Sequence, residues 1–160
     1  LGVDRVAGRI RAGVGAGHVT EPVSSLIAAC RALGVSRIGL ISPYVPRVSE
    51  RLREVLGGAG IEVVAFGSFN EPEEAKVVRI SPASIYAAAH ELGERADIEA
   101  LFLSCTNLRT LDVIDGLEAA LGFPVLSSNQ VLAWHLFGLA GGYVPSRAPG
   151  CLWARAAEQG

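Results

Sequence analysis

Charged side chains are scarce in this sequence, and the two signs nearly balance. Only 19% of the 160 residues are Asp, Glu, Lys or Arg, and the formal net charge at pH 7 is -2. Proteins that bind nucleic acid usually present a basic face, so this composition argues against a nucleic-acid partner. The sequence also lacks the run of about 18 apolar residues that a membrane-spanning helix needs, and it shows no secretory signal. We therefore expect no membrane association.

Cysteine is also rare, and the three cysteines form no pattern. Cys30, Cys105 and Cys151 are an odd number, no two of them are close together, and no Cys-x-x-Cys pair exists. Neither a disulfide framework nor a zinc knot is indicated. Reduced thiols of this kind are typical of a cytoplasmic protein, so a cytoplasmic location is expected. The histidines do not have the spacing of metal ligands, and we expect no metal site.

Signatures of nucleotide binding are absent as well. No expected strand is followed by the glycine pattern of a dinucleotide fold, a P-loop or a kinase glycine-rich loop, so a nucleotide site is not indicated. The sequence is rich in apolar residues: 50% of its residues are hydrophobic. A chain of this length is expected to form one domain with a sizeable core.

Short apolar runs alternate along the chain with stretches of helical periodicity. The expected strands cover residues 37–42, 61–66, 100–103 and 123–127. The expected helices cover residues 22–33, 48–56, 83–94, 111–121 and 129–140, and a long polar loop is expected at 67–80. Alternation with mostly short connections predicts an α/β fold, in which a parallel sheet is flanked by helices on both faces.

Caps and composition set the expected boundaries. Thr20 is the expected N-cap of the first strong helix, and Ser128-Asn129 the expected cap of the last one. We expect an α/β lobe at residues 20–141, preceded by an N-terminal segment at 1–19 with one or two helical turns. Residues 142–160 are expected to be an irregular tail. Cys30 lies in an apolar stripe and is expected to be a core residue.

The most informative stretch begins with the apolar run at residues 100–103 and stops at Cys105, after which helical spacing is expected. Cys105 is therefore expected at the carboxyl end of a strand and at the N-terminus of a helix. Ligands of open α/β sheets bind at that edge, and a helix N-terminus stabilises an anion such as a thiolate. Two interpretations stay open: a reactive thiol in a small-molecule site, or a small residue that fills the end of a strand.

Three loops are expected to converge at the same edge of the sheet. They are the segments 42–46, 104–107 and 127–129, each of which follows an expected strand. Together they offer hydroxyls, the phenol of Tyr44, side-chain amides and helix N-termini. Such a set suits a small carboxylate ligand.

Several motifs of the chain resemble a known family. The run SCTNLRT at residues 104–110, LGFPV at 121–125 and SSNQ at 127–130 resemble the second cysteine region of the aspartate/glutamate/hydantoin racemase superfamily. The most similar branch contains maleate cis-trans isomerase, arylmalonate decarboxylase and ectoine-utilisation proteins. The Pro43-Tyr44 loop and the Val-Arg-Ile stretch at 78–80 fit the same branch.

The resemblance implies a fold of two similar α/β lobes around a cleft, with no cofactor. It implies a cysteine-based isomerase that acts on a small dicarboxylic acid, as maleate isomerase does. The alternatives are an arylmalonate-type decarboxylase or an amino-acid racemase in which Cys105 is the acid or base. A non-catalytic half-protein that binds a carboxylate is a further alternative.

The resemblance also assigns the site residues. Cys105 corresponds to the second catalytic cysteine of the family, and Tyr44 to a tyrosine that reaches the substrate. The residues implied to bind or line the substrate are Pro43, Thr106, Asn107, Ser128 and Asn129.

Two features depart from the family pattern. The segment that should carry the first motif is not present, so we expect this chain to be the second lobe, with residues 1–19 continuing from an absent first lobe. A surface that faces an absent lobe is expected to find a partner, and a homo-oligomer is one expectation. Where the isomerases carry Asn, this chain has Glu74, and a carboxylate near a dicarboxylate would repel it. The alternative for Glu71, Glu73 and Glu74 is a solvated charge run in a loop.

Overall fold

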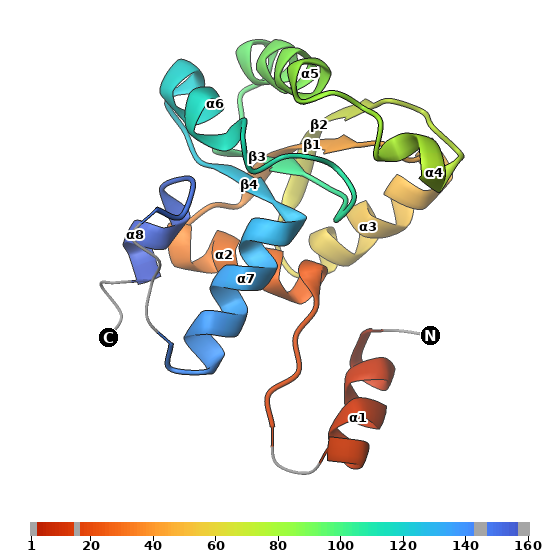
Figure 1. The fold of residues 1–160 in the computed structure, drawn as a ribbon, viewed down its shortest axis with the longest axis vertical. Coiled ribbons are helices and arrows are strands. Elements are labelled where there is room, and N and C mark those ends of the chain that lie inside the picture. Colours follow the sequence, from red (N-terminus) through yellow and green to blue (C-terminus); the bar gives the residue numbers. More distant parts are fainter. Residues whose placement is uncertain (1–2, 15–16, 143–146, 157–160) are drawn as a thin grey trace.

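A four-stranded parallel sheet forms the centre of the protein (Figure 1). The computed structural model describes residues 3–14, 17–142 and 147–156. The strands are β1 (Arg37–Ser42), β2 (Glu62–Ser68), β3 (Ala100–Leu103) and β4 (Val125–Ser127). Their order across the sheet is β2-β1-β3-β4, and every pairing is parallel. The predicted parallel α/β architecture is therefore confirmed.

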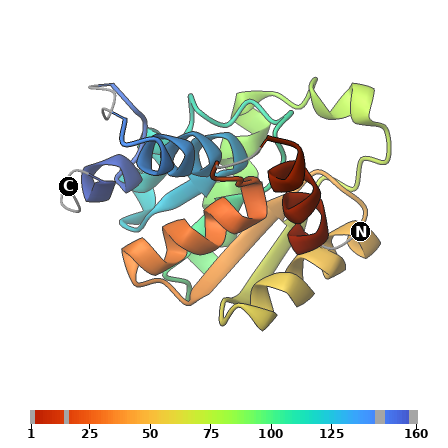
Figure 2. The same cartoon turned by 90° about the horizontal axis from the view of Figure 1, so that it is seen from below.

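Helices cover both faces of this sheet (Figures 1 and 2). The first face carries α2 (Pro22–Leu33), α3 (Pro46–Gly58) and α7 (Ser128–Leu139), and the second face carries α5 (Pro82–Arg95) and α6 (Ile114–Leu121). The remaining helices are α1 (Val3–Val14), α4 (Glu74–Val77) and α8 (Leu152–Ala156). None of the helices in the described ranges combines the length and the apolar character that crossing a bilayer requires.

Two hydrophobic clusters, one on each face of the sheet, make up the core. Along β1, Leu40 points into the first cluster and Ile41 into the second. Along β3, Phe102 and Leu103 divide in the same way, and all four side chains are at most 2% exposed. Successive side chains of a strand point to opposite faces, so a strand covered on both sides has to be apolar throughout. This is why the strands could be recognised as continuous apolar runs.

Two helix starts lie one residue away from the predicted caps. The N-cap of α2 is Glu21, not Thr20, and its carboxylate accepts hydrogen bonds from the N–H groups of Val23 and Ser24 at 2.7 and 2.6 Å. The N-cap of α7 is Ser127, which forms a reciprocal capping box with Gln130. Serine at the cap with glutamine at the third helical position satisfies two N–H groups that would otherwise lack partners.

Two predicted segments are wrong in detail. The helix expected soon after Cys105 begins only at Ile114, and residues 111–113 form a turn. Leu111 shares the apolar spacing of α6, but its side chain is 46% exposed and takes no part in the helix. The polar segment expected to be a loop contains the end of β2, which runs to Ser68, and the short helix α4.

The expected irregular tail contains α8. Its Leu152 and Trp153 are 0% and 7% exposed and belong to the cluster that α2 and α7 also line. The carboxylate of Glu118 accepts a hydrogen bond from the Cys151 N–H at 2.8 Å and fixes the start of this helix. At the other end of the chain, α1 is longer than expected and lies apart from the sheet (Figure 1).

His135 connects α7 to the start of α2. Its Nδ1 atom lies 2.8 Å from the hydroxyl of Thr20 and 3.2 Å from that of Ser25. Burial lowers the pKa of His135 below its ordinary value of 6.5. The folded protein therefore favours the neutral ring, which accepts a hydroxyl hydrogen bond at Nδ1.

This contact predicts a pH dependence of stability. The unfolded state binds a proton to His135 more readily than the folded state does. The His135 contribution is therefore complete above about pH 6.5 and is lost as the pH falls below that value. Denaturant unfolding of the wild-type protein and of His135→Gln at several pH values measures it. We expect the wild type to lose more stability than the variant on mild acidification, and parallel curves would contradict the assignment.

Candidate functional site

The candidate site lies where the sheet changes its direction of winding. The chain leaves β1 for α3 on the first face, and it leaves β3 for α6 on the second face. β1 and β3 are neighbours in the sheet, so the connections after them diverge at their carboxyl ends. Open α/β sheets bind ligands at such a point. Tyr44 follows β1 there, and Cys105 follows β3.

Two polar groups lie at hydrogen-bond distance from the Cys105 sulfur. The phenol oxygen of Tyr44 lies 3.1 Å from Sγ, and the backbone N–H of Asn107 donates to the same sulfur at 3.3 Å. Cys105 is only 5% exposed. Hydrogen bonds from these two groups would be strongest when the sulfur carries negative charge, because hydrogen bonds to a charged acceptor are stronger than those to a neutral one.

The phenol of Tyr44 stays protonated. Burial raises its pKa above the ordinary value, and the hydrogen bond to Cys105 and the negative charges of Cys105 and Glu74 raise it further. A tyrosine with a raised pKa keeps its proton and acts as a donor to the sulfur.

Two serines that sequence reasoning missed hold the Tyr44 backbone. The hydroxyl of Ser42 accepts a hydrogen bond from the Tyr44 N–H at 3.2 Å, and the hydroxyl of Ser68 donates to the Tyr44 carbonyl at 2.5 Å. Ser42 and Ser68 are paired in register at the ends of β1 and β2. A serine at the same height on two neighbouring strands is the signal that could have identified this support.

Ser128 and Asn129 hold the backbone of the Cys105 loop. The Ser128 hydroxyl accepts a hydrogen bond from the Cys105 N–H at 3.1 Å. The Asn129 side chain donates to the carbonyl of Thr106 at 2.9 Å. Both residues are in the first turn of α7, so the helix N-terminus that adjoins Cys105 belongs to α7 and not, as predicted, to the helix that follows the motif.

The remaining predicted site residues lie around this pair. Thr106 and Asn107 are exposed, and the side-chain amide of Asn107 donates to the carboxylate of Glu74 on α4. Pro43 is buried, and its carbonyl accepts a hydrogen bond from the Glu71 N–H at 2.8 Å. The structure thus brings the predicted residues to one edge of the sheet and adds Glu74 to them.

Other candidate groups lie elsewhere. Cys30 is fully buried, and burial raises the pKa of its thiol to about 12, so it is an inert core residue as predicted. His135 lies beside Thr20 and Ser25, and its ring is not hydrogen-bonded to Cys105. Within the described part of the chain, no group of three or more His, Cys, Asp or Glu side chains is arranged to hold a metal ion.

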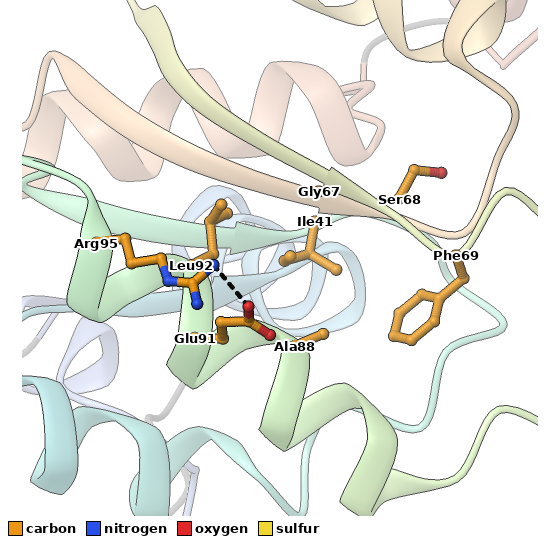
Figure 3. Close-up of a pocket in the computed structure, with 8 residues that line it drawn as sticks. All are labelled: Ile41, Gly67, Ser68, Phe69, Ala88, Glu91, Leu92 and Arg95. Carbon is orange, nitrogen blue, oxygen red and sulfur yellow. Dashed lines mark ion pairs between the residues drawn. The ribbon is translucent and has the colours of Figure 1, made fainter.

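A small cavity of about 280 Å³ lies between α5 and the ends of β1 and β2 (Figure 3). Ile41, Gly67 and Phe69 line it from the sheet side. An ion pair between Glu91 and Arg95 of α5, with an N–O distance of 2.7 Å, lies along the helix side. Neither Tyr44 nor Cys105 lines this cavity, so we do not assign the chemistry to it.

Comparison with known proteins identifies relatives with two different activities. The family described as arylmalonate decarboxylase matches residues 8–153 of this chain. The arylmalonate decarboxylase of Bordetella bronchiseptica is 33% identical over 129 residues, which are 80% of this chain and 54% of that protein. The maleate isomerase of Geobacillus stearothermophilus is 31% identical over 115 residues, 71% of this chain and 45% of that protein. The chain therefore spans about half the length of the curated relatives that it matches.

Solved structures share the fold. A crystal structure of arylmalonate decarboxylase superposes with a TM-score of 0.85 at 29% identity, covering 94% of this chain and 67% of that one. The Nocardia farcinica maleate cis-trans isomerase bound to TRIS superposes with a TM-score of 0.86 at 22% identity, covering 97% of this chain and 63% of that one. The lobe described above is thus a recurring architecture.

The Ser128 contact predicts a loss of stability. Ser128→Ala leaves the Cys105 N–H without its hydrogen-bond partner in a buried position, which costs about 1–3 kcal/mol. Asn129→Ala removes a contact in a more exposed position and should cost less. Denaturant unfolding of both variants measures the difference. If Ser128→Ala unfolded at the same denaturant concentration as the wild type, this hydrogen bond would not contribute to the stability of the fold.

The Tyr44 environment predicts a delayed ionisation. Because its pKa is raised above the ordinary value of 10.0, Tyr44 should ionise only after an exposed tyrosine has done so. An alkaline titration of tyrosinate absorbance, taken as the difference between wild type and Tyr44→Phe, isolates this group. We expect no difference signal at the ordinary pKa and a rise only at higher pH. A difference curve centred on the ordinary value would contradict the described contacts.

Proposed function

The chain belongs to the arylmalonate decarboxylase family, as its cysteine motif predicted, and from this premise we propose that it supplies the reacting thiol of a cofactor-independent enzyme acting on a small carboxylic acid. The observation that carries the proposal is the pair of donors, Tyr44 and the Asn107 N–H, on the Cys105 sulfur. A stabilised thiolate is a nucleophile and, once protonated, an acid. Both roles are useful next to a carboxylate.

In its more specific form the proposal is an isomerase that acts on a small unsaturated dicarboxylic acid. The Cys105 thiolate forms a C–S bond to one carbon of the cis double bond, and the displaced electron pair moves toward the adjacent carboxylate. Rotation about the resulting single bond follows. The electron pair then re-forms the double bond in the trans geometry, and the C–S bond breaks and restores the thiolate. Electrons balance without an oxidant or reductant, so the cycle needs no redox cofactor.

The substrate carboxylate would lie against the exposed loop that follows Cys105. Thr106 and Asn107 are exposed there, and their position at the carboxyl ends of β1 and β3 suits a small anion. Ser128 and Asn129 act through the loop backbone, so we propose them as positioning residues. Tyr44 would donate a hydrogen bond to the sulfur and stabilise charge that develops on it.

A second candidate is a decarboxylase or racemase in which Cys105 transfers a proton. In a decarboxylase, the C–C bond to one carboxylate of a malonate breaks, CO2 leaves, and the electron pair remains as an enediolate. The Cys105 S–H then protonates that carbon, and solvent restores the thiol proton. The family match and the 33% identity to an arylmalonate decarboxylase support this candidate.

Turnover assays test the proposal and separate its two forms. Maleate converted to fumarate identifies the isomerase, and phenylmalonate converted to phenylacetate identifies the decarboxylase, both followed by proton NMR. Cys105→Ser should lower the rate of the active reaction by roughly 10²–10⁴-fold, since an acid–base group is typically worth that much. Tyr44→Phe should lower it by about 10–100-fold, the value of one hydrogen bond to a charged group.

The matched control is Cys151→Ser, which removes an exposed thiol that is not among the candidate site residues and should leave the rate unchanged. Full activity of Cys105→Ser would overturn the proposed role of the thiol. If the wild-type chain bound a carboxylate but turned over neither substrate, the non-catalytic binding alternative would replace the enzyme.

A further inference from the structure

Glu74 brings an uncompensated negative charge to the edge of the candidate site. It is the first residue of α4, which lies in the connection between β2 and α5. Its Oε1 accepts a hydrogen bond from the side-chain amide of Asn107, whose own N–H donates to the Cys105 sulfur. One residue therefore links the Glu74 carboxylate to the thiol.

No basic side chain neutralises Glu74 in the part of the chain that the structure describes. The only lysine, Lys76, forms an ion pair with Glu73 instead. Nor does Oε2 of Glu74 accept a hydrogen bond from any described residue. The carboxylate thus keeps both a full charge and an acceptor oxygen for another partner. The charge of Glu74 also acts on Tyr44, since it is one of the causes that raise the pKa of the phenol.

A charge in this position discriminates between substrates. The second carboxylate of a dicarboxylic acid would be repelled if it lay near Glu74, because like charges a few ångströms apart interact unfavourably. An ammonium or amide group in the same place would donate a hydrogen bond to the free oxygen. The Asn107 side chain adds a second acceptor there, because its nitrogen faces Glu74 and its carbonyl oxygen has no other described partner.

We propose that Glu74 is a specificity-determining residue that selects a small carboxylic acid carrying an amide or ammonium group where a dicarboxylic acid carries its second carboxylate. The inference rests on the proposed function, since it assumes that one substrate carboxylate lies beside Cys105. It narrows the general form of that function, an enzyme acting on a small carboxylic acid, to monocarboxylates with a hydrogen-bond donor at the other end, in place of the dicarboxylic acid of the more specific form. It assigns Glu74 no part in bond making or breaking.

A pair of matched probes tests the selection. Succinate and succinamate have nearly the same shape and differ in one terminal group, a carboxylate or an amide. Neither has a double bond, so neither is isomerised. Binding is followed on isotope-labelled protein through the amide signals of Cys105 and Asn107, and the measured quantity is the ratio of the two dissociation constants. A change in folding would affect both probes alike and leave that ratio unchanged.

In the wild type we expect succinamate to bind more tightly than succinate. Glu74→Gln removes the charge but keeps an acceptor for Asn107, and it should shift the ratio toward succinate by about tenfold, the size expected for one charge near another at a partly exposed site. Glu73→Gln is the matched control: it removes the same charge from the neighbouring residue, which contacts Lys76 and not Asn107. It should leave the ratio unchanged.

The outcomes separate this inference from the proposed function. If both probes perturbed Cys105 and Asn107 but Glu74→Gln left the ratio unchanged, the role of Glu74 would be wrong and the carboxylate site would stand. If Glu73→Gln shifted the ratio as much as Glu74→Gln, the effect would be a general one of net charge, and the inference would also fail. If neither probe perturbed these signals in any variant, the proposed carboxylate site beside Cys105 would be wrong, and so would the specificity role of Glu74.

Discussion

The pairing of β1 with β3 is the constraint on which the site depends. Tyr44 and Cys105 are 61 positions apart in the chain, and they meet because their strands are neighbours where the winding of the sheet reverses. The register places Ile41 beside Leu103, and both side chains are buried in the same cluster. A slip of one residue would turn these side chains to the opposite face, so the core that stabilises the lobe also fixes the height at which the phenol meets the sulfur.

Around that pair, the loop backbone is held before any substrate arrives. Ser42 and Ser68 hold the two sides of the Tyr44 peptide, while Ser128 and Asn129 hold the Cys105 loop. Donors fixed in this way need no reorganisation when charge develops on the sulfur, which is the basis of electrostatic preorganisation. The carboxylate of Glu74 can be accommodated nearby because it is exposed, and solvent lowers the free-energy cost of its charge. The charge can still act on a bound substrate.

Much of the fold could be predicted from the sequence because burial on both faces leaves a strong local signal. The apolar run of β3 is a signal of this kind. The end of α2 could be predicted for another reason, because its C-cap Gly34 has the positive φ that glycine readily adopts. The start of α6 could not be predicted, since Leu111 continues the helical spacing although its backbone is in a turn. α8 was missed because five residues carry no period, and only packing against α2 and α7 buries its Trp153.

The candidate site was predictable to a similar extent. Cys105 and Tyr44 stand at strand ends that were expected to converge, and the resemblance to a family supplied the role expected of each. The supporting contacts join segments that are distant in sequence, such as Glu74 with Asn107 and Ser128 with Cys105, and no local pattern encodes them. Only tertiary structure reveals that the first residues of two helices, Glu74 of α4 and Ser128 of α7, reach the same short stretch.

The measurement that tests the central claim most directly is the rate at which iodoacetamide alkylates Cys105 at neutral pH. Peptide mapping by mass spectrometry separates this thiol from Cys30 and Cys151. If two donors stabilise a thiolate at the sulfur, Cys105 should react faster than free cysteine under the same conditions, and Tyr44→Phe should slow it. A Cys105 that reacts no faster than free cysteine, with or without Tyr44, would contradict the account and leave a thiol that only fills the end of a strand.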